Sequence, residues 1–176
     1  MKVKTVYKNK WFSVTNDKNF YTVDENTDQV TILPIIDRNK LLLVKQYRHA
    51  IKKYTLEFPS GGIDKNETPK SGAVRELFEE TGITIINHKK LIELPTISVN
   101  PQRNRKYPKI YYFNTSKKEI PKKINEKNKE IDKLYIVDFK SFLNLCEKRL
   151  IISSFMISVF FLYLLKKKIK LKYEKN

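Results

Sequence analysis

The four glycines of the chain all lie between positions 61 and 82, and this clustering constrains the fold more than any other feature. Glycine is favoured where the backbone takes a positive φ or approaches another group closely. Gly61 and Gly62 therefore predict a tight loop with exposed peptide groups. Gly82 predicts the left-handed cap of a helix end. Because Thr68 is a suitable N-cap, the sequence predicts a helix over 69–81 between these two features.

This predicted helix has one acidic face. At 100° per residue, Glu76, Glu79 and Glu80 share a side with Gly72 beside them. The opposite, apolar side consists of Ala73, Val74, Leu77 and Phe78. Like charges at these spacings destabilise a bare helix by several tenths of a kcal/mol per pair, and a bound divalent cation reverses that sign. The pattern indicates a Mg²⁺ site, whereas the same letters alone also suit a solvated acidic surface.

Two neighbouring groups can complete such a site. Arg75 lies four residues before Glu79 and can hold that carboxylate in place. The backbone carbonyls of Ser60 and Gly61 can add neutral oxygen ligands. The three glutamates, Ser60 and Gly61 are therefore the candidate metal ligands.

Apolar runs around this segment predict an α/β fold. Residues 29–36 and 41–47 read as a β-hairpin, and 56–58 as a short extended piece. Further strands are predicted over the ranges 83–86, 91–94, 110–113 and 134–137, and helices over 141–146 and 150–165. Strands interrupted by one helix and followed by others indicate a mixed sheet with helices on its faces. The polar stretch 115–129 reads as a mobile loop.

The run from Leu150 to Leu165 contains sixteen residues without a charge. As a helix it would extend roughly 24 Å, less than the roughly 30 Å hydrocarbon layer of a membrane. We interpret it as a buried C-terminal helix, with an interfacial or membrane-anchoring helix as the alternative. The sequence near the N-terminus shows no export signal and Cys146 is the only cysteine, so we expect a cytoplasmic protein.

The chain carries a formal net charge of +17, which raises the question of a polyanionic partner. Lysine supplies most of the positive charge and is spread along the whole chain, as a skewed genome composition would also produce. We interpret the charge as a solvated surface and expect neither a specific nucleic acid nor a membrane as partner. Binding of a polyanion is the alternative.

Residues 61–83 resemble the Nudix box, G-x5-E-x7-R-E-U-x-E-E-x-G-U with U aliphatic, at every specified position. The matching residues are Gly61, Glu67, Arg75, Glu76, Leu77, Glu79, Glu80, Gly82 and Ile83. Nine matches by chance are expected at well under roughly one in a million starting positions. The chain is therefore identified as a member of the Nudix hydrolase family.

The resemblance implies an α/β/α sandwich with a mixed β-sheet, a box helix and a C-terminal helix. It leads us to expect a single domain over 1–176, with a short N-terminal extension (1–28), the box (61–83) and the C-terminal helix (150–168). It also implies Mg²⁺ or Mn²⁺ as cofactor. By the family pattern Glu76 and Glu80 are the principal ligands, and Glu79 is either a further ligand or a partner that supports the ligands. All three are therefore candidate catalytic residues.

Outside the box, the chain is similar to the ADP-ribose pyrophosphatase-like branch. The similar segments are KWFSV (10–14), VKQYR (44–48) and LEFPSG (56–61). The resemblance implies hydrolysis of a nucleoside diphosphate linked to another moiety, with ADP-ribose or a related nucleotide sugar giving AMP and a sugar phosphate. It makes Arg48 the candidate that approaches the diphosphate, with Glu57 and Arg103 as further substrate-binding candidates. Some branch members are dimeric, which makes a homodimer a further expectation.

The chain departs from the branch pattern after the box, where Asn100–Arg105 stands in place of a Pro-Gly loop. The family often takes its catalytic base from a distal-loop glutamate, and the candidates here are Glu119, Glu126 and Glu130. Two other functions stay open. One is hydrolysis of a dinucleoside polyphosphate or a nucleoside triphosphate, and the other is a non-catalytic nucleotide-sensing or RNA-binding module.

Overall fold

The computed structural model describes residues 3–121 and 131–170, and its centre is the predicted hairpin. Strand β4 (Gln29–Ile36) turns into the antiparallel strand β5 (Lys40–Arg48), with Ile35 opposite Leu41. Asp37 and Arg38 take positive φ angles of 48° and 73° in the turn. Aspartate is one of the few residue types that adopt this conformation readily, which suits it to the first position of the turn. The predicted hairpin is confirmed.

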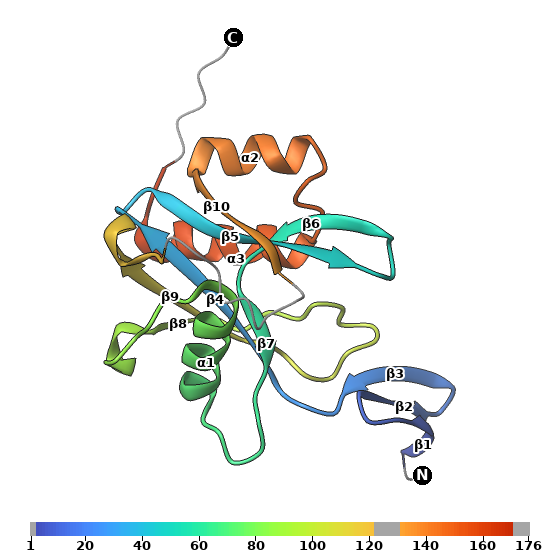
Figure 1. Cartoon of the computed structure of the whole chain (residues 1–176). Coiled ribbons are helices and arrows are strands. Elements are labelled where there is room, and N and C mark those ends of the chain that lie inside the picture. The colour runs from blue at the N-terminus through green and yellow to red at the C-terminus, as the bar shows by residue number, and fades with distance from the viewer. Residues whose placement is uncertain (1–2, 122–130, 171–176) are drawn as a thin grey trace.

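A mixed sheet is built around this hairpin (Figure 1). Its strand order is β10-β5-β4-β9-β8, with β6 paired to β5 and β7 paired to β4. Strand β9 runs parallel to β4, whereas the other pairs are antiparallel. The added strands are β6 (Lys53–Glu57), β7 (Ser60–Gly62), β8 (Ile92–Leu94), β9 (Lys109–Thr115) and β10 (Ile131–Asp138). The prediction of a mixed sheet is confirmed.

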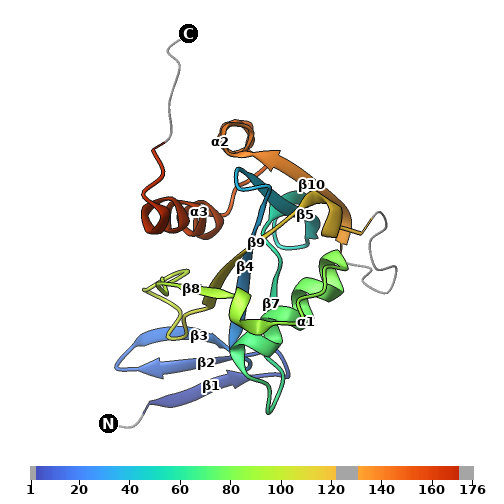
Figure 2. The same cartoon turned by 90° about the vertical axis from the view of Figure 1, so that its left-hand side faces the viewer.

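Helices cover both faces of this sheet (Figure 2). Helix α1 (Pro69–Thr81) packs on one face, where Ala73 and Leu77 join strand residues in one apolar cluster. Helices α2 (Phe139–Glu147) and α3 (Ser154–Lys167) pack on the other face in a second cluster. Successive residues of a strand point to opposite faces, so one buried strand such as β4 supplies both clusters. The expected α/β/α sandwich is present.

The N-terminal residues form a second sheet that sequence analysis did not identify within the expected extension 1–28. It contains β1 (Lys4–Lys8), β2 (Phe12–Asp17) and β3 (Phe20–Glu25), paired antiparallel in that order. Most of its side chains are exposed or half-buried, so its strands lack the long apolar runs that reveal a core strand. Figure 1 shows this sheet beside the lower end of the central one.

Three local predictions need correction. Among the described residues, Ile83 and Ile85 belong to no strand; their side chains are buried beneath α1, but the backbone there is irregular. Phe78 is 46% exposed and lies outside the cluster that Ala73 and Leu77 join, because it is turned about 100° around the helix from Leu77. The C-terminal helix begins at Ser154, four residues later than expected from the apolar run.

Helix α3 nevertheless lies in the core, as predicted. Its buried side chains are Phe155, Met156, Val159, Phe160, Tyr163 and Leu164. None of the helices in residues 3–121 and 131–170 has the length and apolar content needed to cross a membrane. Of the predicted loop 115–129, the described part contains a short 3-10 turn, η2 (Lys117–Glu119).

Candidate active site

Helix α1 has the boundaries that its sequence predicts. The hydroxyl of Thr68 accepts a hydrogen bond from the amide of Ser71 at 3.2 Å, and Pro69 is the first helical residue. Gly82 ends the helix with φ of 73°, and its amide donates to the carbonyl of Phe78 at 2.8 Å. Both ends are therefore closed by local hydrogen bonds, which fixes where each glutamate of the helix lies.

Two glutamates of α1, Glu76 and Glu80, face the short strand β7, and Gly61 allows the contact of Glu76. A Cβ atom added at Gly61 would lie 2.2 Å from Cδ of Glu76 and within 2.4 Å of both its carboxylate oxygens. Any side chain at this position would therefore displace Glu76. On the neighbouring residue, the amide of Ser60 donates to Oε2 of Glu80 at 3.1 Å. Glu76 and Glu80 thus meet two consecutive residues of one strand.

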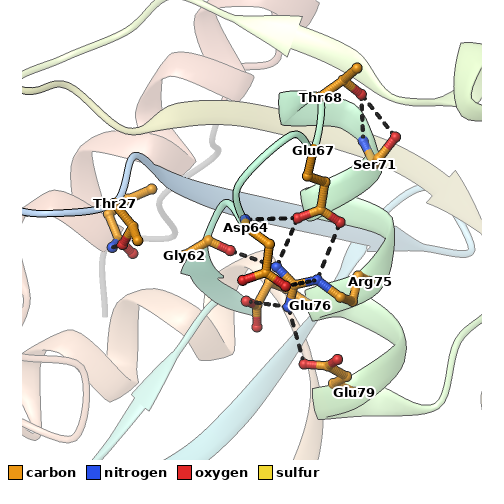
Figure 3. Close-up of polar contacts among 10 residues, drawn as sticks. Thr27, Gly62, Asp64, Glu67, Thr68, Ser71, Arg75, Glu76 and Glu79 are labelled. Atoms are coloured by element: carbon orange, nitrogen blue, oxygen red, sulfur yellow. Dashed lines mark hydrogen bonds and ion pairs between the residues drawn. The ribbon is translucent and has the colours of Figure 1, made fainter. Parts of the chain in front are cut away.

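Arg75 is the centre of an ionic network that supports this arrangement (Figure 3). Its Nη2 donates to the carbonyl of Gly62 at 2.7 Å and to Oε2 of Glu67 at 3.0 Å. Its Nη1 donates to Oε1 of Glu76 at 2.8 Å and to Oε2 of Glu79 at 3.3 Å. The predicted contact between Arg75 and Glu79 is present, and Arg75 also holds Glu76. The hydrogen bonds to Glu67 are the main cause that raises the pKa of Arg75 above its ordinary value.

Glu67 takes part in this network although sequence analysis gave it no role beyond matching the box. It accepts from the amide of Asp64 at 3.0 Å as well as from Arg75, and the Arg75 hydrogen bonds lower its pKa. A Cβ at Gly72 would lie 3.1 Å from Oε2 of Glu67, so Gly72 leaves room for this side chain rather than for the three α1 glutamates. The sequence feature that could have indicated this contact was the fixed spacing of Glu67 and Arg75 in the box.

Burial raises the pKa of two carboxyls at this site. The pKa of Glu80 rises to about 8, mainly because its side chain is buried and further because the charge of Glu76 lies nearby. Burial also raises the pKa of Glu76, and this effect exceeds the lowering by Arg75. A buried carboxylate is costly without a compensating charge. The site therefore favours either protonation or the approach of a cation.

The donor chemistry of this site fits a hard divalent cation. Glu76 and Glu80 present carboxylate oxygens beside the peptide groups of Ser60 and Gly61, and such ions prefer oxygen ligands. The three glutamates do not converge as one cluster, because Glu79 turns to Arg75 and its side chain is 45% exposed. Within the described ranges, no three acidic, histidine or cysteine side chains are grouped closely enough to form a complete metal site.

Arg48 and Glu57 form an ion pair on neighbouring strands next to the box. Nε of Arg48 donates to Oε1 of Glu57 at 2.8 Å, and Nη2 donates to Oε2 at 2.5 Å. Glu57 is buried, whereas the Arg48 side chain is 42% exposed. Both charges act on Glu80, Arg48 lowering its pKa and Glu57 raising it. The structure thus brings these two predicted substrate-binding residues to the box.

The other predicted site residues lie elsewhere. Nη1 of Arg103 donates to the carbonyl of Tyr21 at 3.0 Å, which places Arg103 against the N-terminal sheet. Glu119 closes the η2 turn, where its carboxylate accepts from the amide of Ser116 and from the hydroxyl of Thr115. Glu126 and Glu130 lie outside the described residues.

Comparison with known proteins decides the family. Residues 25–151 match the family described as the NUDIX domain, a range that includes the box and all strands of the central sheet. The chain belongs to the NUDIX family. In this chain, the predicted site depends on the contact of Glu76 and Glu80 of α1 with Gly61 and Ser60 of β7.

Two curated relatives agree with the predicted branch. The chain is 38% identical over 72 residues to the ADP-ribose pyrophosphatase of Bacillus subtilis (strain 168), a match that covers 41% of this chain and 37% of the relative. It is 42% identical over 62 residues to the ADP-sugar pyrophosphatase of Mus musculus, covering 33% of this chain and 28% of the relative. The matches thus span about a third of these relatives' lengths. They support the resemblance of this NUDIX protein to the ADP-ribose pyrophosphatase-like branch.

A solved structure confirms the fold over nearly the whole chain. The crystal structure of an ADP compounds hydrolase superposes with a TM-score of 0.72 and 22% sequence identity. The match covers 97% of this chain and 95% of that chain. At this identity the likeness establishes the fold alone, and its coverage shows that the shared fold includes the N-terminal sheet.

Proposed function

We propose that this NUDIX protein is a divalent-cation-dependent hydrolase of the diphosphate bond in a nucleoside diphosphate linked to another moiety. ADP-ribose or a related nucleotide sugar is the proposed substrate, with AMP and a sugar phosphate as products. The observation that carries the proposal is the placement of Glu76 and Glu80 against Ser60 and Gly61. The names of the two relatives, an ADP-ribose pyrophosphatase and an ADP-sugar pyrophosphatase, support the choice of substrate class.

Glu76 and Glu80, together with the carbonyls of Ser60 and Gly61, would hold Mg²⁺ or Mn²⁺, with Glu79 as a further ligand. When bound, the cation supplies charge neutralisation at the diphosphate and polarisation of the attacking water. The raised pKa values of Glu76 and Glu80 support this assignment, because a cation compensates the buried negative charge that the protein alone leaves costly.

The remaining groups orient the substrate and accept a proton. Arg48 presents a guanidinium that suits diphosphate oxygens, and Glu57 keeps it oriented from the buried side. Arg75 holds the β7 carbonyl of Gly62 against α1, which maintains the spacing between strand and helix. The proton of the attacking water goes to a glutamate. This glutamate is either a residue of the helix, such as Glu79, or one of the distal-loop residues Glu126 and Glu130.

A hydrolysis screen tests the proposal. The full chain is incubated with ADP-ribose, a nucleotide sugar, a dinucleoside polyphosphate or a nucleoside triphosphate, each with Mg²⁺, with Mn²⁺ or with chelator. We expect cation-dependent release of AMP from ADP-ribose, measured by chromatography. Glu80→Gln should lower the rate by on the order of 100-fold, because it removes the buried negative charge that faces the cation.

Glu93→Gln is the matched control, since Glu93 lies on β8 and pairs with Lys109 on the surface. It should retain the wild-type rate. Full activity in Glu80→Gln would contradict the assignment of this residue. Binding of nucleotide or RNA by the wild type, with no hydrolysis of any compound under any cation, would instead favour the non-catalytic alternative.

A further inference from the structure

Strands β4 and β5 diverge from their common turn, and the segment that carries Ser60 lies between them. The direct pairing of β4 with β5 covers the two residue pairs next to the turn. Farther along, β5 pairs with β6 and β4 pairs with β7, while β10 and β9 occupy the outer edges. Glu57 ends β6 and Ser60 begins β7, so the two residues Phe58 and Pro59 bridge the gap between the diverging strands.

The side chain of Phe58 joins the apolar cluster of α2 and α3, on the opposite face of the sheet from α1 (Figure 2). Phe58 is fully buried, and its ring lies nearly parallel to the ring of Phe142 in α2, with centroids 5.7 Å apart and an angle of 5° between the planes. Phe142 is also fully buried and packs in turn against Phe160 of α3, with centroids 4.6 Å apart. The bridge is therefore held from the face that does not carry the box helix.

The backbone leaves little freedom between this ring and the predicted cation ligands. The carbonyl of Pro59 accepts from the amide of Ile32 at 2.8 Å, which ties the bridge to β4. Ser60 and Gly61 follow directly and pair with β4. Phe58 is thus two residues from the first of the two candidate carbonyl ligands. A shift of its ring in the core would move the peptide groups of Ser60 and Gly61, because the chain between them is too short to absorb the change.

Cation sites depend on the groups that orient their ligands as well as on the ligands themselves. Mg²⁺ in particular requires ligand oxygens at nearly fixed distances and angles. We propose that Phe58 and Phe142 are positioning residues for the predicted cation site. Their stacked rings hold the peptide groups of Ser60 and Gly61 at the spacing from the α1 carboxylates that the cation needs. The inference rests on the proposed function and extends it to α2, a helix on the other face of the sheet.

Binding of Mn²⁺ to the full chain, measured by titration calorimetry, tests the inference without catalysis. Phe142→Ala removes the ring that supports Phe58 and should weaken Mn²⁺ binding about tenfold, as expected when a group that orients a metal ligand is lost. Tyr163→Ala is the matched control. Tyr163 is 3% exposed in the same cluster, but its ring packs against Tyr112 of β9 and Phe139 at the start of α2. This variant should lower the urea midpoint comparably and bind Mn²⁺ as the wild type does.

If Phe142→Ala does not fold, Phe142→Leu and Tyr163→Leu give the same comparison with a smaller loss of packing. Equal Mn²⁺ affinities in the Phe142 and Tyr163 variants would overturn the inference. If the wild type hydrolyses its substrate while the Phe142 variant binds Mn²⁺ normally, only the positioning role is wrong. If Mn²⁺ binding depends on Phe142 and no compound is hydrolysed, only the proposed function is wrong. A wild type that binds no Mn²⁺ would overturn both.

Discussion

At the scale of single residues, the two adjacent glycines of β7 are not equivalent. A Cβ at Gly61 would collide with the carboxylate of Glu76, whereas a Cβ at Gly62 would lie 3.1 Å from Oγ1 of Thr27. The first contact involves a proposed cation ligand, and the second involves a side chain in the segment just before β4. The requirement for glycine at position 61 therefore comes from a close approach between strand and helix.

Gly61→Ala should lower kcat/KM for the preferred substrate by roughly 10- to 100-fold, because the new methyl group displaces the Glu76 carboxylate. The displaced atoms are the free end of a flexible side chain, so the free energy of unfolding should fall by only about 1 kcal/mol. Steady-state kinetics and urea unfolding measure the two effects. Gly62→Ala is the control and should keep its activity; equal activity losses in both variants would show that Gly61 has no special relation to Glu76.

At the scale of elements, α3 shows how packing decides whether an apolar run is buried in the core or lies on the surface. Its length and serines left two interpretations open in the sequence, a core helix or an interfacial one. In the fold Phe160 is fully buried, with its ring centroid 4.6 Å from Phe142 and 5.2 Å from Phe139. The next residue, Phe161, is 44% exposed. The helix therefore contributes to the core through one face only.

Phe160→Ala should reduce the free energy of unfolding by about 3 to 5 kcal/mol, since it removes a buried ring and leaves a cavity. Phe161→Ala should change it by less than about 1 kcal/mol, because its ring is largely outside the core. Chemical denaturation followed by circular dichroism measures both. Similar losses from the two substitutions would contradict the packing of α3 on the sheet.

At the scale of the whole molecule, the segment after the box joins the N-terminal sheet to the central one. The carbonyl of Arg103 accepts from the amide of Val23 at 2.7 Å, and Nε of Arg105 donates to Oδ2 of Asp24 at 2.8 Å. The segment that departs from the branch pattern thus serves here as a structural connection. A single domain over 1–176, a homodimer and a cytoplasmic location stay predictions.

The Asp24–Arg105 pair should give this connection a pH dependence. Burial by itself would raise the pKa of Asp24, but the hydrogen bonds and charge of Arg105 outweigh it and lower the pKa below 3.8. The folded protein therefore keeps Asp24 ionised to a lower pH than the unfolded chain does. The resulting stabilisation is complete well above pH 3.8 and is lost as the pH falls through the lowered pKa.

Arg105→Gln tests this dependence. The difference in free energy of unfolding between wild type and variant should be constant near neutral pH and should shrink below pH 3.8. Urea unfolding at a series of pH values measures it. Arg103→Gln is the control, since its guanidinium donates to a backbone carbonyl and its effect should not vary with pH. A difference for Arg105→Gln that persists unchanged into acid would show that Asp24 is not its partner in stability.

Much of the fold could be predicted because it depends on contacts between near neighbours in the chain. The bounds of α1 follow from Thr68 and Gly82, and the β4–β5 hairpin follows from two apolar runs around a short turn. The N-terminal sheet escaped prediction because its strands are largely exposed and carry little apolar pattern. The segment at Ile83 was mistaken for a strand because burial beneath a helix produces the same alternation.

By itself the sequence determined that an acidic helix face follows a pair of glycines, since helical spacing and capping are properties of a local stretch of chain. The structure places these glycines in strand β7 rather than in the tight loop that the sequence predicted. Only the tertiary structure decided which of the three carboxylates contact β7 and which contacts Arg75. Glu76 and Glu80 lie against β7 while Glu79 reaches Arg75, because packing on the sheet sets the distance between strand and helix. The same packing brought Arg48 and Glu57 to Glu80 and kept Arg103 at the N-terminal sheet, through contacts between residues far apart in sequence.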